Sequence, residues 1–225
     1  DQVVGTSPHD PNSLPHPGYS YVERLREGID SKLRIAYSPD LGYAVVQSDI
    51  AKAVEEGAKV FEGLGHSLEE VKGGPPLIAG EWGKLGSLEV GGGIYDLLPE
   101  HEAEFGRSFI SGIKGSETIT MAWWGKAAHD RERLNSWCTE IFNNYDVLIT
   151  PTIPFDPPPA GGPFPDEVEG RKQCDVGVAA FTIPFNLSWH PAATVRAGIS
   201  DAGLPIGLQI VGPRHRDDLV LQVAK

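Results

Sequence analysis

Cysteine, methionine and positive charge are all scarce in this chain. Its 225 residues include two cysteines and one methionine, and 19 Lys and Arg stand against 31 Asp and Glu, for a formal net charge of -12. Two cysteines, Cys138 and Cys174, are too few for a disulfide framework and have no metal-type spacing, so a cytoplasmic location is expected. Without runs of Lys or Arg, the acidic chain is not expected to bind nucleic acid or a membrane surface.

Long apolar runs and cofactor-binding motifs are also lacking. No stretch is long and apolar enough to cross a membrane, and no basic segment followed by an apolar one marks a leader. The three glycines at 91–93 fit neither phosphate-binding pattern, GxxxxGK[ST] or GxGxxG. His9 with Asp10, and His215 with Asp217, would each offer two ligands where a catalytic metal needs three. We therefore expect no cofactor and no metal.

The clearest local pattern lies at 181–212, FTIPFNLSWHPAATVRAGISDAGLPIGLQIVG. There an extended approach is expected to end at Pro191, followed by a strand over 193–199, a turn over 200–203 and a returning strand over 206–211. Gly203 can adopt the positive φ that such a turn needs, and Pro205 stands where a strand begins without losing a hydrogen-bond donor. The pattern predicts an antiparallel hairpin.

A second pattern, at 33–71, predicts a strand, a helix and a strand. The strands are expected over 33–37 and 67–71, and the helix from an N-cap at Ser48 through Leu64. Two strands joined by a helix of this length lie parallel, which places the chain in the α/β class.

Other segments complete a single domain over 1–225. The apolar run at 147–150, closed by Pro151, predicts a strand buried on both faces, and a long helix is expected over 116–143. A last helix opens at Asp217, whereas 1–18 is linker-like, 154–165 is a proline-dense loop and no element is predicted in the glycine-rich segment 73–99. We expect a mixed, partly parallel sheet with helices on both faces.

Three segments in this order resemble the amidase signature family of serine amide hydrolases. They are LRIAYSPDLGYAVVQSDIAKAVEEGAKVFEGLG at 33–65, YDVLITPTIPFDPPP at 145–159, and FNLSWHPAATV with GLPIGLQIVGP at 185–213. The resemblance is to the C-terminal portion of the family and implies its α/β fold. It also implies hydrolysis of a small-molecule amide through an acyl-serine intermediate in the intact enzyme.

The family's catalytic residues are not found in this chain. In the family they are a Ser nucleophile, a bridging Ser on a cis peptide and a Lys, supplied by a Gly/Ser-rich motif and a Lys in the N-terminal half. Here the glycines at 91–93 have no adjacent serine, and Gly115 with Ser116 has the pattern of a helix cap. The chain is therefore expected to supply sheet and pocket wall, with no catalytic residue, beside an upstream half of the same enzyme or within a homo-oligomer.

Five residues are candidates for substrate binding. Thr150, Pro151 and Thr152 follow a buried strand at a position that borders the substrate cleft in the family, although the strand could simply end at a proline. Trp189 and His190 stand where many relatives carry smaller residues such as Gly, so they could line a pocket or serve only in packing.

Other functions stay open at this point. One is a non-catalytic, truncated amidase-like binding protein, and another is the glutaminase subunit of a tRNA amidotransferase. A thiol hydrolase built from Cys174, His190 and an Asp is a weaker alternative, because nothing in the sequence ties these residues together.

Overall fold

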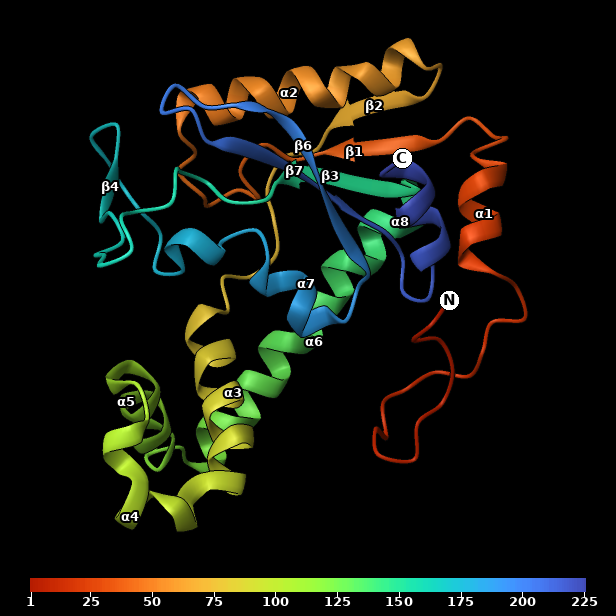
Figure 1. Cartoon of the computed structure of the whole chain (residues 1–225). Helices are drawn as coiled ribbons and strands as arrows, with labels where there is room; N and C mark the ends of the chain where they lie inside the picture. The colour runs from red at the N-terminus through yellow and green to blue at the C-terminus, as the bar shows by residue number, and fades with distance from the viewer.

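The computed structural model describes the whole chain apart from the side chain of Ala79, and it contains a five-stranded sheet with helices on both faces (Figure 1). The strands are β1 (Arg34–Tyr37), β2 (Ser67–Glu70), β3 (Val147–Pro151), β4 (Glu167–Val168), β5 (Arg171–Lys172), β6 (Ala192–Ile199) and β7 (Pro205–Val211). The helices are α1 (Tyr21–Glu27), α2 (Ser48–Gly63), α3 (Ala79–Ile94), α4 (Leu98–His101), α5 (Arg107–Ser116), α6 (Met121–Asn144), α7 (Ile183–Ser188) and α8 (Asp217–Val223).

The main sheet is parallel on one side and antiparallel on the other. Its strand order is β2-β1-β3-β7-β6, in which β1 pairs in parallel with both β2 and β3. β7 runs antiparallel to β3 and to β6, while β4 and β5 form a separate two-stranded ribbon. These pairings confirm the predicted α/β class, the strand–helix–strand unit and the mixed sheet.

The centre of the sheet is β3, and all five of its residues are buried. It has a strand on each side, α2 on one face and α6 and α8 on the other, so its apolar run has no exposed side (Figure 1). α2 packs through Ile50, Val54 and Ala58. It approaches closely at Gly57, where a Cβ atom would stand 3.0 Å from Cδ1 of Leu208.

The predicted hairpin is confirmed. β6 and β7 pair from Ala192↔Val211 to Ile199↔Pro205, and Gly203 in the turn has φ 81°. The N–H of Asp201 donates to the Asp49 carboxylate at 2.8 Å, which ties the turn to the start of α2. The turn chemistry and the helix start therefore fix each other.

A helical lobe formed by α3, α4 and α5 extends from the sheet, and α6 runs from the sheet into it (Figure 1). The lobe has a small core of its own, made by Leu98, Ile110 and Ile113. The predicted helix over 116–143 begins later than expected, because Thr120 Oγ1 accepts the N–H of Trp123 at 3.1 Å and caps α6, whereas Ser116 ends α5. The glycine-rich segment, for which no element is predicted, contains α3.

Three further expectations are corrected by the structure. The approach to Pro191 is helical, because α7 occupies Ile183–Ser188 with a proline in its first turn. Ser48 is the first residue of α2 rather than its N-cap, and its hydroxyl donates to Glu169 at 2.6 Å. The proline-dense loop over 154–165 does not simply cover the surface, since it buries the side chain of Phe155.

No helix in the described part of the chain has both the length and the apolarity of a membrane span.

Candidate functional site

The site is built at the end of α7, where the chain turns into β6. α7 ends at Ser188, and Trp189 adopts the left-handed conformation with φ 58°. Its indole is 66% exposed, and the guanidinium of Arg131 lies 4.7 Å from the ring centroid. An exposed tryptophan thus stands at a backbone position that glycine usually occupies.

His190, the next residue, is held in a partly buried position. Its Nδ1 shares a hydrogen bond of 2.8 Å with Ser188 Oγ, and its ring stacks on Phe142 at 5.1 Å between centroids. Burial, with a smaller contribution from the charge of Arg214, lowers the pKa of His190 to about 4. The imidazole is therefore neutral at pH 7 and can both donate and accept a hydrogen bond.

Two arginines converge on the end of α7. Arg131 Nε donates to the Leu187 carbonyl at 2.7 Å, and Arg214 Nε donates to the next carbonyl, that of Ser188, also at 2.7 Å. Arg214 Nη2 also donates to Asn135 Oδ1 at 2.6 Å. Cations at this end of a helix are favourable, because its last carbonyls have no helical partner.

A cavity of about 1110 Å³ opens beside these groups. It is bounded by α3, α6, the end of α7, the segment before α8 and the N-terminal loop, and its lining includes Trp189 and His190. Trp82, Leu85 and Leu187 supply apolar walls, while the two arginines supply positive charge. The cavity is therefore both apolar and cationic.

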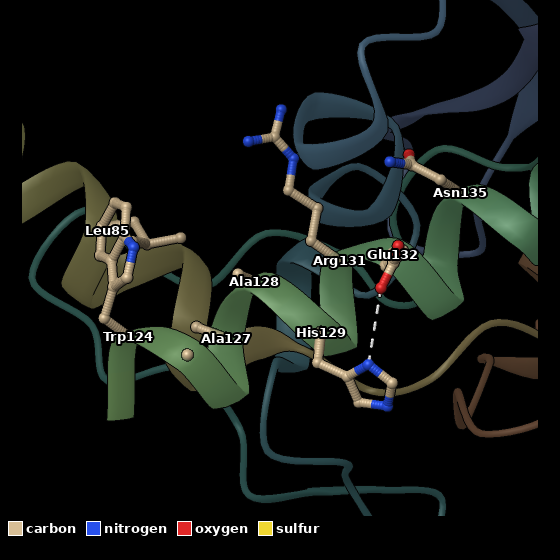
Figure 2. Close-up of a pocket in the computed structure, with 9 residues that line it drawn as sticks. Leu85, Trp124, Ala127, Ala128, His129, Arg131, Glu132 and Asn135 are labelled. Atoms are coloured by element: carbon tan, nitrogen blue, oxygen red, sulfur yellow. Dashed lines mark ion pairs between the residues drawn. The ribbon is translucent and has the colours of Figure 1, made fainter. Parts of the chain in front are cut away.

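A second cavity, of about 590 Å³, adjoins the first and shares Leu85, Arg131 and Asn135 with it. Figure 2 shows Leu85 and Trp124 at one end of this cavity and Asn135 at the other. His129 pairs with Glu132 at 3.6 Å, and Arg131 extends away from that pair (Figure 2). The two cavities form a groove along α6.

Thr150, Pro151 and Thr152 lie at the C-terminal end of β3. Thr150 is fully buried, and its hydroxyl donates to the Pro151 carbonyl at 2.7 Å and accepts Gln209 Nε2 at 3.0 Å. The N–H of Thr152 donates to the Gly207 carbonyl at 2.9 Å, and its hydroxyl lies 3.2 Å from that of Thr194. These contacts fasten the strand end to the hairpin.

The structure does not bring the five candidates into one site. Across the sheet Leu148 aligns with Val211 and Ala192, and Thr150 aligns with Gln209 and Thr194. Trp189 and His190, which precede β6, therefore lie toward the N-terminal end of β3, and Thr152 lies beyond its other end. The cavity beside α7 includes only Trp189 and His190 of the five.

The side chains that the sequence reasoning missed are Arg131, Asn135 and Arg214. Arg131 and Asn135 are four residues apart on α6, a spacing that puts them on one face, but only the fold brings Arg214 to them. A thiol nucleophile at Cys174 would need His190 as its base, and the ring of His190 instead contacts Ser188 and Phe142. Among the described residues no group of three His, Cys, Asp or Glu is placed to bind a metal.

Comparisons with known proteins agree over the whole chain. The family model described as Amidase matches residues 99–221. An acylamidase from Rhodococcus erythropolis is 31% identical over 232 positions, covering 100% of this chain and 47% of the relative. A 6-aminohexanoate-cyclic-dimer hydrolase from Pseudomonas sp. (strain NK87) is 40% identical over 247 positions, covering 100% of this chain and 49% of the relative.

A solved structure has the same fold. A bacterial aryl acylamidase of the amidase signature enzymes superposes with a TM-score of 0.86 at 24% identity, covering 98% of this chain and 47% of that one. The chain spans about half the length of the curated relatives it matches.

Proposed function

Because the chain belongs to the amidase signature family, we propose that it is the C-terminal part of an amide hydrolase that acts through an acyl-serine intermediate. The observation that supports this proposal is the match of the whole chain to about half of an acylamidase and of a cyclic-dimer hydrolase. The chain would form one domain over 1–225, with 1–18 as a linker. It contains no Gly/Ser-rich catalytic motif, so the serines and the lysine would come from the upstream half.

In this proposal the chain contributes structure and pocket wall. Trp189 and His190 would line the substrate pocket, since both border the cavity beside α7. Thr150, Pro151 and Thr152 would border the cleft from the end of β3. The contacts of the Thr150 hydroxyl favour a positioning role for this residue rather than direct contact with the substrate.

The sheet itself favours a partner. β6 lies at one edge of the sheet and is partly exposed along its eight residues, and β2 lies at the other edge. An open edge strand presents unpaired N–H and C=O groups that readily pair with another chain. We therefore propose that the upstream half of the same enzyme completes the sheet, or that a homo-oligomer covers the same surface.

The alternative of a tRNA amidotransferase glutaminase has less support. The corresponding glutamyl-tRNA(Gln) amidotransferase polypeptide from Dehalococcoides mccartyi (strain CBDB1) is 38% identical, but over 103 residues that cover 46% of this chain. The two amide hydrolases match the full length of the chain, so the hydrolase is the better-supported function.

The proposal is tested by assaying the chain alone and after co-expression with the region encoded upstream of it. On a panel of aliphatic amides and anilides, the chain alone is expected to show no turnover, because removing one catalytic group already costs several orders of magnitude. The pair is expected to hydrolyse at least one amide, and a serine-directed reagent should block the activity. Turnover by the chain alone, or a folded complex with no activity on any amide, would contradict the proposal.

A further inference from the structure

Arg131 and Arg214 present positive charge to the cavity beside α7 without a carboxylate partner. Each guanidinium carries five N–H donors, of which the contacts to the α7 carbonyls and to Asn135 use one and two. Within the described part of the chain, neither arginine forms an ion pair, in a protein whose formal charge is -12. Capping α7 explains the Nε donors but leaves terminal N–H groups available to an anion.

The conformation of Trp189 indicates that the position serves more than the helix end. A non-glycine residue in the left-handed region is strained, and such strain persists mainly at functional sites. A glycine would end α7 without this strain, and an indole that is 66% exposed gains little from burial. What the tryptophan does provide is a flat surface beside the guanidinium of Arg131, at the mouth of the cavity.

The rest of the lining restricts the ligand. Trp82, Leu85 and Leu187 suit an apolar body, and the volume of about 1110 Å³ accommodates a small molecule. Glu89 and Asp217 also line the cavity, so a doubly charged phosphate would meet more repulsion there than a single negative charge. The planar fork of a guanidinium matches a carboxylate.

We propose that this cavity binds a monocarboxylate with an aryl or alkyl body, its carboxylate held between Arg131 and Arg214 and its body placed on Trp189 and Leu85. As a statement about the enzyme's substrate or acid product, the proposal rests on the function proposed above. The binding itself requires no turnover, so it can fail or hold independently of amide hydrolysis.

The test compares 4-phenylbutyrate with its neutral amide, 4-phenylbutyramide, in ligand-observed NMR titrations of the 225-residue chain. The two probes share one apolar body and differ in charge. We expect the acid to bind at least 10-fold more tightly than the amide. R131Q and R214Q should each weaken the acid at least 10-fold and the amide less than 3-fold, and W189G should weaken both.

R133Q is the matched control. Arg133 lies two residues from Arg131 on α6, pairs with Asp130 at 3.4 Å and lines neither cavity described above. It removes the same charge, so binding of the acid should stay within 2-fold of the wild type. Circular dichroism and a thermal melt of each variant confirm that it is folded.

Several results would overturn the proposal. Equal binding of acid and amide to the wild-type chain would remove the role of the charge, and this comparison needs no variant. Loss of acid binding in R133Q equal to that in R131Q would show a general charge effect. No detectable binding of the acid to the folded chain would remove the site altogether.

Discussion

The sheet and the helical lobe achieve their packing in different ways. In the sheet, one large core gathers residues from β1, β3, β7, α2 and α8, many of them fully buried. In the lobe, the cluster of Leu98, Ile110 and Ile113 is small, and α3 contains six glycines in 16 residues. The sheet is held by contacts between segments far apart in sequence, whereas the lobe depends on a few local ones.

This difference predicts unequal responses to the same substitution. Ile149 in β3 and Ile113 in α5 are 0% and 1% exposed, so Ile→Ala removes the same buried group from each. Ile149→Ala is expected to lower the free energy of unfolding of the chain by about 2–5 kcal/mol, since the cavity opens inside the common core. Urea denaturation followed by circular dichroism measures the loss.

Ile113→Ala is the matched partner of that variant. Its cost is expected to fall on the lobe alone, so hydrogen exchange should accelerate over 79–120 while global unfolding changes little. Equal losses of global stability in the two variants would show that the lobe and the sheet unfold as one unit, and the comparison would fail.

The second prediction concerns His190, at the junction of the two regions. Because burial lowers its folded pKa to about 4 from an ordinary value near 6.5, the unfolded chain binds more protons between these values. Stability that is present above pH 6.5 is therefore lost as the pH falls toward 4, by roughly 1 to 2 kcal/mol once solvent screening of this partly exposed ring is allowed for.

Thermal melts at pH 7 and pH 5 measure this loss, and His190→Gln is the control. The variant cannot gain a proton in that range, so its melting temperature should fall less between the two pH values than that of the wild type. The same fall in both proteins would assign the effect to other groups.

The smallest predicted effect is a gain in the lobe. Gly83 is exposed in α3, and a Cβ atom added there would meet nothing within 4 Å. Gly83→Ala should therefore stabilise α3 by about 0.5–1 kcal/mol, because alanine loses less backbone entropy than glycine in a helix. Slower hydrogen exchange over 79–94 would confirm it, and faster exchange would mean that α3 needs its glycines.

The sequence predicted the sheet far better than the lobe, and the reason is physical. The apolar run of β3 and the turn at Gly203 are local signals that agree with the long-range packing. In α3 local propensity opposes the helix, which exists because Leu85 and Tyr95 pack against other segments. α7 was also missed, because its proline and its left-handed Trp189 resemble an extended lead-in.

The candidate site was predicted only in part. Trp189 and His190 lie beside a cavity, but the arginines that give it charge come from residues 131 and 214, which no sequence spacing connects. Thr150 is a candidate because it ends a buried strand, yet that signal cannot tell whether its hydroxyl faces a ligand or, as observed, bonds to Gln209. Side-chain partners of this kind are set by tertiary contacts.

The central claim is that this chain is completed by an upstream half, and sedimentation tests it most directly. The separately expressed chain should self-associate or unfold without a cooperative transition, because open strand edges and apolar surface favour association. Co-expressed with the upstream region, it should sediment as a defined complex that unfolds cooperatively. A well-behaved monomer of the chain alone, with a sharp thermal transition, would contradict the claim and favour an amidase-like binding protein.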